Sequence, residues 1–169
     1  AVRRAARGDE PSAGELFDEF YPRVYRYALA KMGDPVDAED VAAETFAKAL
    51  KGLDRSVWTR GGFGAWIFRI ASNVVVDQVR FRVRETGVEI PDRTGEQTDP
   101  HLAPEAAFLL LDTGDELREA LASLPGAQRE VLLLRFAAGL DAKECGVVMR
   151  RKAKAVRRLQ STGLAALAK

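Results

Sequence analysis

The chain has 169 residues, with 26 basic and 25 acidic side chains, and its hydrophobic content of 47% is ordinary for a soluble globular protein. One cysteine, Cys145, excludes an intramolecular disulfide and an all-thiolate zinc site, and one histidine, His101, argues against a His-based metal cluster or catalytic triad. No apolar run could span a bilayer and no signal-peptide core follows the first ten residues, so we expect a cytoplasmic protein without membrane insertion.

The charges are divided unevenly along the chain. Residues 1–84 have a net charge of +2, residues 85–115 combine eight acidic side chains with one basic one for a net −7, and residues 116–169 have a net +6. The overall charge of +1 therefore conceals three electrostatic blocks. Six basic residues fall within nine positions: Arg150, Arg151, Lys152, Lys154, Arg157 and Arg158.

Helical spacing of apolar residues dominates the first block. Residues 12–32 predict one helix, which Pro22 should kink or break and which Gly33 should end. A second helix is predicted to begin near Asp34 or Asp37, to run to about residue 51 and to bury Val41, Phe46 and Leu50. A third is predicted from residue 63 to about 84, with one apolar stripe formed by Phe63, Trp66, Ile67, Ile70 and Val74.

Residues 85–104 are rich in proline, glycine and polar residues and lack periodicity, which is typical of a linker between two domains. Helical spacing returns with Leu117, Leu121 and Leu124, and a further apolar helix follows Pro125-Gly126 and ends before Gly139. We therefore expect an all-α fold of two small helical domains, an N-terminal bundle (residues 1–84) and a C-terminal domain (115–169), joined by a flexible acidic linker (85–114).

The end of the chain predicts a helix-turn-helix motif. Asp141 and Glu144 form a capping-box pattern at the start of one short helix, and a last helix is expected over residues 152–168. Gly146 provides the small residue that two closely packed helices require. Val156 and Leu159 would hold the last helix in place, which leaves Lys154, Arg157, Arg158 and Ser161 facing outward to contact DNA bases and phosphates. The alternative is a solvated basic face with no specific partner.

Four stretches together resemble the extracytoplasmic-function, or group 4, sigma factors of bacterial RNA polymerase, within the sigma-70 family. They are "ELFDEFYPRVYRYALAKMGD", "DAEDVAAETFAKAL", "FGAWIFRIASNVVVDQVR", and "LASLPGAQREVLLLRFAAGLDAKE" followed by "AVRRLQSTGLAAL". Two features depart from the family pattern. Arg150 and Arg151 occupy a turn that usually holds a glycine and an apolar residue, and Gly163 lies within the last helix, where glycine costs up to about 1 kcal/mol relative to alanine.

The resemblance implies a sigma factor that binds core polymerase and recognises two promoter elements, under the control of an anti-sigma factor. The core polymerase-binding residues would be Asp37, Glu39, Asp40 and Glu44, although some of these carboxylates could merely satisfy a helix N-terminus. The minus-ten element would be bound by Trp58, Thr59, Arg60, Asn73, Asp77, Arg80 and Arg84. The minus-thirty-five element would be bound by Arg150, Arg151, Lys152, Lys154, Arg157, Arg158 and Ser161. Trp66 fits the core better than a stacking surface, and the linker would thread through polymerase or act as a solubilising spacer.

We expect no enzymatic activity, and so no catalytic residue, cofactor or metal. One alternative is a helix-turn-helix regulator that does not bind core polymerase. Another is an enzyme with a carboxylate metal site at Asp40 and Glu44, which occupy one helical face but lack an obvious third ligand.

Overall fold

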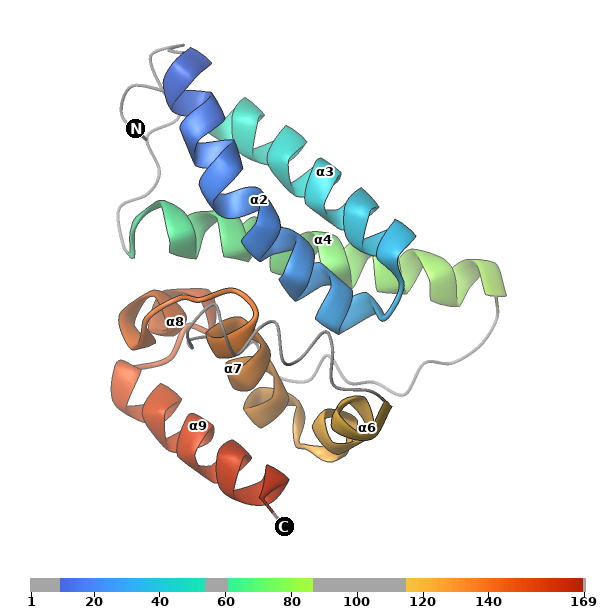
Figure 1. Cartoon of the computed structure of the whole chain (residues 1–169), viewed down its shortest axis with the longest axis vertical. Helices are drawn as coiled ribbons and strands as arrows, with labels where there is room; N and C mark the ends of the chain where they lie inside the picture. The colour runs from blue at the N-terminus through green and yellow to red at the C-terminus, as the bar shows by residue number, and fades with distance from the viewer. Residues whose placement is uncertain (1–9, 54–60, 87–114, 169) are drawn as a thin grey trace.

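A computed structural model describes residues 10–53, 61–86 and 115–168, and within these segments every regular element is a helix. This confirms the predicted all-α class. None of these helices combines the length and apolar character needed to cross a membrane. Figure 1 shows two lobes, an N-terminal lobe of three helices above a C-terminal lobe of four. The helices are α2 (Glu10–Met32), α3 (Pro35–Gly52), α4 (Gly62–Thr86), α6 (Asp115–Ser123), α7 (Gly126–Phe136), α8 (Ala142–Val148) and α9 (Ala153–Leu167).

In the N-terminal lobe, α2 and α3 lie side by side and α4 crosses behind them (Figure 1). The core between the three helices is fully buried at Val24 and Tyr27 of α2, Val41 of α3 and Phe68 of α4. The rings of Tyr27 and Phe68 meet edge to face with their centroids 5.7 Å apart. The buried faces of the three helices therefore meet in this core.

The boundary between α2 and α3 follows from local chemistry. Gly33 has a φ of 73°, a left-handed conformation that glycine adopts without steric cost, and it ends α2. Asp34 then caps α3, because its Oδ1 accepts hydrogen bonds from the backbone N–H groups of Val36 and Asp37 at 2.9 and 3.1 Å. The capping carboxylate is thus Asp34, which decides between the two predicted starts of this helix, Asp34 and Asp37.

Helix α2 continues through Pro22 without the break that the sequence allowed for, and Phe20 and Val24 are buried on either side of it. The expectation that Leu50 is buried is wrong. Leu50 is 56% exposed rather than buried. Its neighbour Ala49, about 100° around the helix, is buried instead.

In the C-terminal lobe, α7 is the central helix and buries Val131, Leu132, Leu133 and Leu134. The side chain of Arg129 fixes α7 to the end of α6. Its Nε donates to the carbonyl oxygen of Leu121 at 2.7 Å, and Nη2 donates to those of Ala122 and Leu124 at 2.9 and 2.8 Å. One guanidinium thus satisfies carbonyl groups that the end of α6 leaves without helical partners.

The two lobes are in direct contact. Helix α2 packs against α7, α4 packs against α8, and one continuous apolar cluster contains Leu16 and Phe63 of the first lobe together with Leu132 and Leu140 of the second. The sequence predicted two helical domains but gave no sign that they would pack together. The expected linker lies almost entirely outside the described residues.

Candidate functional site

The predicted helix-turn-helix is formed by α8, a turn at residues 149–152, and α9. The capping box at the start of α8 is present in full. Asp141 Oδ1 accepts hydrogen bonds from the backbone N–H groups of Lys143 and Glu144 at 2.5 and 2.9 Å, and Glu144 Oε2 accepts one from the backbone N–H of Asp141 at 2.6 Å. These reciprocal bonds confirm the predicted start of α8.

The turn explains why Gly146 is glycine. A Cβ on Gly146 would lie 2.4 Å from the backbone carbonyl oxygen of Arg151, a distance that real Cβ atoms do not reach. The backbone N–H of Arg151 also donates to the carbonyl oxygen of Gly146 at 2.9 Å. Arg150 holds a φ of 55°, a left-handed conformation that is unfavourable for an arginine. The family-typical glycine is therefore absent from a turn whose backbone still adopts the glycine-like conformation.

Helix α9 is anchored by the residues that the sequence selected. Val156 is fully buried, and Leu159 packs against the same small cluster, which includes Val131 of α7 and Cys145 of α8. Gly163 lies where α9 passes close to α7. A Cβ there would lie 3.3 Å from Leu132 Cδ1, so the absence of a side chain permits the close approach of α9 to α7.

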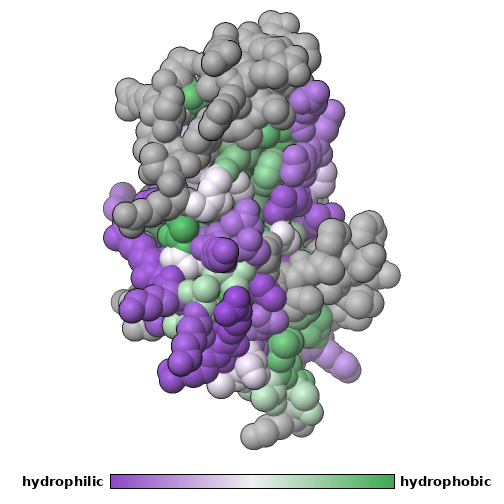
Figure 2. Space-filling view, turned by 90° about the vertical axis from the view of Figure 1, so that its left-hand side faces the viewer, coloured by the Kyte–Doolittle hydropathy of each residue, from purple (hydrophilic) through white to green (hydrophobic). Residues whose placement is uncertain are grey.

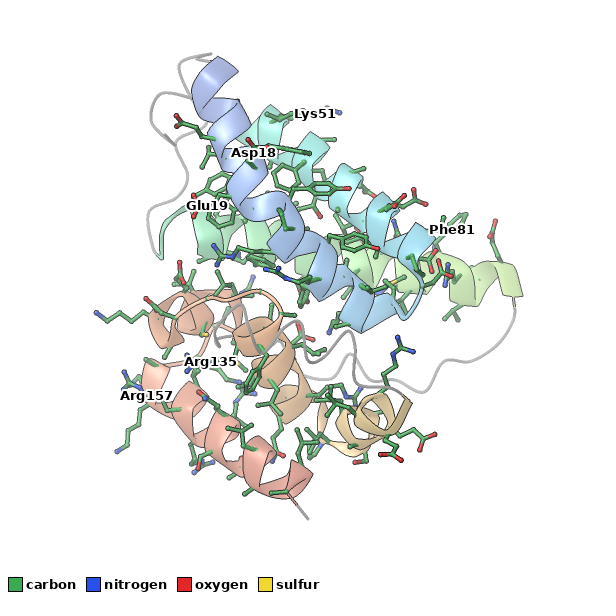
Figure 3. The ribbon with its side chains drawn as sticks, in the orientation of Figure 1. Asp18, Glu19, Lys51, Phe81, Arg135 and Arg157 are labelled. Carbon is green, nitrogen blue, oxygen red and sulfur yellow. The ribbon has the colours of Figure 1, made fainter. Side chains whose placement is uncertain are left out.

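This anchoring turns the basic side chains outward. Lys152, Lys154, Arg157, Arg158 and Ser161 are exposed, as is Arg150 in the turn, whereas Arg151 is half-buried. Figure 3 shows Arg157 pointing away from the lobe, and Figure 2 shows a largely hydrophilic surface over the lower half of the face that carries the starts of α8 and α9. The exposed face has no acidic residue between positions 150 and 161. It is suited to phosphates and to the acceptor edges of guanine.

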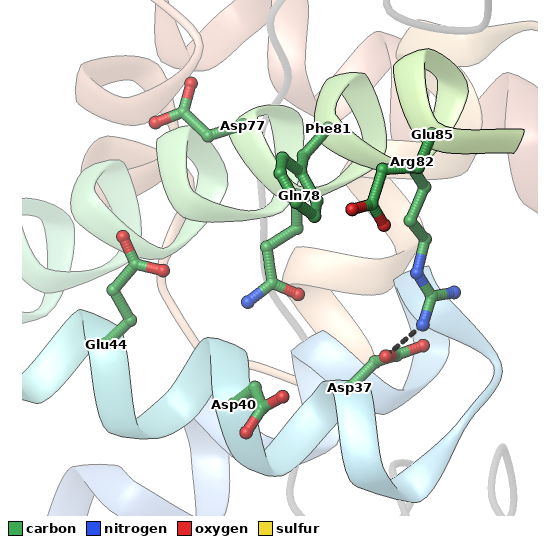
Figure 4. Close-up of a pocket in the computed structure, with 8 residues that line it drawn as sticks. All are labelled: Asp37, Asp40, Glu44, Asp77, Gln78, Phe81, Arg82 and Glu85. Carbon is green, nitrogen blue, oxygen red and sulfur yellow. Dashed lines mark ion pairs between the residues drawn. The ribbon is translucent and has the colours of Figure 1, made fainter.

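A second candidate site is an open groove between α3 and α4, which we call the acidic groove (Figure 4). It is lined by five carboxylates and one guanidinium, together with an amide and a phenyl ring: Asp37, Asp40, Glu44, Asp77, Gln78, Phe81, Arg82 and Glu85. Arg82 forms an ion pair with Asp37, and Lys48 lies 2.7 Å from Glu44 and 3.9 Å from Asp77. The groove retains an excess of negative charge that would attract a basic partner and repel phosphates.

The predicted polymerase-binding residues do not all face solvent. Asp40 is exposed and Glu44 is half-buried, and both line the acidic groove, while Glu39 is exposed on α3 outside it. Asp37 is 8% exposed and is engaged with Arg82. The main role of the Asp37 carboxylate is therefore to join α3 to α4. It does not cap the helix end, which is the role of Asp34.

The predicted minus-ten residues fall into two groups. Asn73, Asp77, Arg80 and Arg84 are all exposed on α4, and their spacing of four, three and four positions places them on one side of the helix. Trp58, Thr59 and Arg60 lie outside the described residues. Trp66 is half-buried against the core, with its ring centroid 5.5 Å from that of Phe63, as expected for a structural residue.

Sequence reasoning missed the part of the acidic groove that α4 contributes. Phe81 is 59% exposed there, and Gln78 and Glu85 complete the wall (Figures 3 and 4). The spacing of Asp77, Phe81 and Glu85 by four residues was a usable signal, because it predicts one shared helical face. Nothing in the sequence indicated that this face would border α3.

No three His, Cys, Asp or Glu side chains in residues 10–53, 61–86 and 115–168 come together in a way that could hold a metal ion. Asp40 and Glu44, the pair considered for such a site, lie on the wall of the acidic groove.

Comparisons with known proteins agree with this architecture. Residues 16–85 match the family described as sigma-70 region 2, and residues 114–167 match sigma-70 region 4. The chain is 35% identical over 173 residues to the ECF RNA polymerase sigma factor ShbA of Streptomyces griseus, covering 98% of this chain and 91% of that one. It is 33% identical over 174 residues to the ECF RNA polymerase sigma factor BldN of Streptomyces coelicolor. That alignment covers 99% of this chain but 63% of BldN, so the chain spans less than two thirds of that relative.

A solved structure shares the fold. The chain resembles the sigma factor RpoE of Bartonella quintana, solved in complex with the anti-sigma factor NepR, with a TM-score of 0.67 and 24% identity over 91% of this chain and 92% of that one. The arrangement of helices described above is therefore one that other sequences also adopt.

Proposed function

The chain belongs to the extracytoplasmic-function (ECF) family of RNA polymerase sigma factors, and we propose that it binds core RNA polymerase and directs promoter-specific initiation of transcription. Sigma factors are initiation factors rather than enzymes. The observation that carries the proposal is the coexistence, in one chain, of an outward-facing basic helix α9 and an acidic groove on the other lobe. The alternative of a helix-turn-helix regulator accounts for the first feature but gives no role to the second.

The C-terminal lobe, with residues 115–169 as its proposed extent, would recognise the minus-thirty-five element through α9. Val156 and Gly163 fix the helix against α7, so the outward direction of Lys154, Arg157 and Arg158 is set by packing. A helix of this size fits the major groove. Arg150, Arg151 and Lys152 precede the helix, where contacts to phosphates would fix its position on the duplex.

The N-terminal lobe, with residues 1–84 as its proposed extent, would bind polymerase and the minus-ten element. Asp40 and Glu44 in the acidic groove and Glu39 beside it are available to a basic surface of polymerase, with Phe81 adding exposed apolar area. Asn73, Arg80 and Arg84 would face the minus-ten DNA together with residues 58–60. Asp77 remains a candidate for this DNA contact, although its position in the groove also makes it available to polymerase.

Three further parts of the proposal follow from the family. Residues 85–114 would connect the lobes as an acidic linker. The protein would act in the cytoplasm, where bacterial polymerase is found. An anti-sigma factor would control it, a proposal supported by the likeness to RpoE of Bartonella quintana, which was solved with the anti-sigma factor NepR.

The test is run-off transcription with bacterial core polymerase, a promoter library and no other sigma factor. We expect start-site-specific transcripts whose upstream sequences share two elements. Lys154→Ala and Arg157→Ala should each lower the yield and reduce the salt dependence of promoter binding, by roughly one unit in the slope of log affinity against log salt for each phosphate that is no longer neutralised. Lys51→Ala, at an exposed position on α3, is the matched control. Binding to duplex DNA without binding to core polymerase would favour the regulator instead.

A further inference from the structure

Phe81 is an exposed aromatic residue in a groove that is otherwise lined mainly by charged side chains. It is 59% exposed and lies on the α4 wall of the acidic groove, with Asp77 and Glu85 one helical turn away on either side (Figure 4). Asp40 of α3 lines the opposite wall. The face of a phenyl ring is itself weakly negative, so ring and carboxylates act in the same sense. The groove therefore attracts a cation in two ways.

The carboxylates of the groove are only partly neutralised within the chain. Arg82, the guanidinium in the groove lining, is engaged with Asp37. Asp37 is 8% exposed, yet its Oδ2 has no hydrogen-bond partner among the described residues. Asp40 and Glu85 have no ion-pair partner in the same part of the chain. A buried carboxylate oxygen without a donor is unfavourable, so the groove is complementary to a partner that brings both positive charge and N–H groups.

The charges around Phe81 distinguish between the partners that could cover an exposed phenyl ring. A nucleic-acid base would stack on the ring, but it would bring phosphates that the neighbouring carboxylates repel. An apolar side chain would cover the ring, but it would also remove those carboxylates from water without replacing their hydrogen bonds. A cation is attracted by the ring and by the carboxylates together.

The geometry favours the guanidinium of arginine over the ammonium of lysine. A planar guanidinium can lie flat on an aromatic ring while its N–H groups donate to carboxylates at the sides, whereas an ammonium group is compact and strongly hydrated. The chain contains this arrangement elsewhere on its own side chains. Arg23 Cζ lies 4.6 Å from the centroid of the Phe20 ring, and Arg23 Nη1 lies 3.8 Å from Glu19 Oε1.

We propose that the acidic groove binds an arginine side chain of core polymerase, and that Phe81 makes the groove selective for arginine. The guanidinium would lie over the Phe81 ring and donate hydrogen bonds to Asp77 and Glu85, while Asp40 on the opposite wall adds negative charge. The inference rests on the proposed binding of core polymerase. It adds the chemistry of the contact and the residue that selects the partner side chain.

The test replaces Phe81, in the full chain, with phenylalanines that carry one, two or three fluorine atoms on the ring. Fluorine withdraws electron density from the face of the ring and so weakens its attraction for a cation, while the shape and the apolar character of the side chain are largely kept. Affinity for core polymerase would be measured by titrating fluorescently labelled protein. We expect the dissociation constant to rise with each fluorine, to about fivefold or more with three.

The matched control is the same fluorinated series at Phe17, an exposed phenylalanine of α2 that stacks on Tyr21 outside the groove. This series should leave the affinity for core polymerase unchanged. Phe81→Leu keeps an apolar side chain but removes the aromatic ring, so it should weaken binding at least as much as three fluorines. Circular dichroism would confirm that each variant is folded.

A second measurement tests the selectivity for arginine without polymerase. A single fluorine on the Phe81 ring serves as the NMR probe, and the full chain is titrated with N-acetyl-arginine amide or with N-acetyl-lysine amide. The arginine amide should give a saturable shift of the fluorine resonance at millimolar concentration, and the lysine amide a smaller shift at the same concentration. Glu85→Gln should reduce the response to arginine, because it removes one of the flanking carboxylates.

The outcomes separate this inference from the proposed sigma function. Unchanged affinity for core polymerase across the Phe81 series, or equal shifts with the two amides, would overturn the arginine site. The groove would still be a polymerase contact if Asp40→Asn weakened binding. Normal core affinity of Phe81→Leu, combined with weaker binding of the holoenzyme to pre-melted promoter DNA, would assign Phe81 to base stacking instead. Failure of the parent protein to bind core polymerase would count against the sigma function itself, whatever the fluorine resonance shows.

Discussion

The backbone of Arg151 fills the space that a side chain on Gly146 would need. The backbone carbonyl oxygen of Arg151 lies 2.4 Å from the point where a Cβ on Gly146 would be, and the two residues are also joined by a backbone hydrogen bond of 2.9 Å. The obstacle is backbone rather than a mobile side chain, so it cannot move aside without changing the turn that sets the direction of α9.

Gly146→Ala should therefore destabilise the protein, by about 1–3 kcal/mol as for other overpacked sites. The measurement is chemical denaturation, followed by promoter binding of the folded fraction. Gly14→Ala is the matched control, because Gly14 lies within α2 with nothing close to its missing Cβ. Here alanine should stabilise by about 0.5–1 kcal/mol through its better helix propensity. Equal effects at both sites would contradict the close approach.

Arg150→Gly should change stability and DNA binding in opposite directions. Arg150 holds a φ of 55°, a conformation that costs a residue with a Cβ about 1–2 kcal/mol relative to glycine. Glycine should raise the free energy of unfolding by part of that amount. Removal of the exposed charge should weaken promoter binding and reduce its salt slope by about one unit if Arg150 contacts a phosphate. A stabilised variant with unchanged binding would remove Arg150 from the DNA interface.

Asp40→Asn and Glu44→Gln should lower the affinity for core polymerase without loss of stability beyond about 0.5 kcal/mol, because Asp40 is exposed and Glu44 is half-buried. Asp37→Asn should be different, since it weakens the ion pair with Arg82 and so loosens α3 from α4. Affinity would be measured by titrating fluorescently labelled protein with core polymerase. Asp18→Asn, an exposed acid on α2, is the control and should bind normally. Unchanged affinity of both groove variants would exclude the groove as a polymerase contact.

Glu144→Gln should alter the pH dependence of stability. Burial, followed by the Asp141 charge, raises the pKa of Glu144 to about 7, while Arg23 partly opposes this. The pKa of Glu144 is higher in the folded than in the unfolded state. Its contribution to the stability of the folded state is therefore complete below about pH 4.5 and is lost as pH rises through 7. Thermal unfolding from pH 4.5 to 8 should show the parent losing stability relative to Glu144→Gln, by about 1 kcal/mol or less given solvent screening of this half-exposed group. A constant difference would contradict the raised pKa.

The sequence by itself determined the local features of this protein. Asp34 as a cap, Gly33 and Gly139 at helix ends, and the capping box of Asp141 all rest on interactions between residues close together in the chain. Apolar periodicity identified the helices and most of their inward faces, because burial repeats with the helical turn. The family resemblance rested on these same local patterns.

Tertiary structure decided which faces meet. Leu50 is exposed although the periodicity placed it inward, and Gly163 lies close to Leu132 of α7. Asp77 enters the acidic groove because α4 runs beside α3. The hydrogen bond from Tyr27 to Glu130 joins residues 103 positions apart. Periodicity shows that a helix has an inward face but not what covers it, so contacts of this kind follow only from the packing of all the helices together.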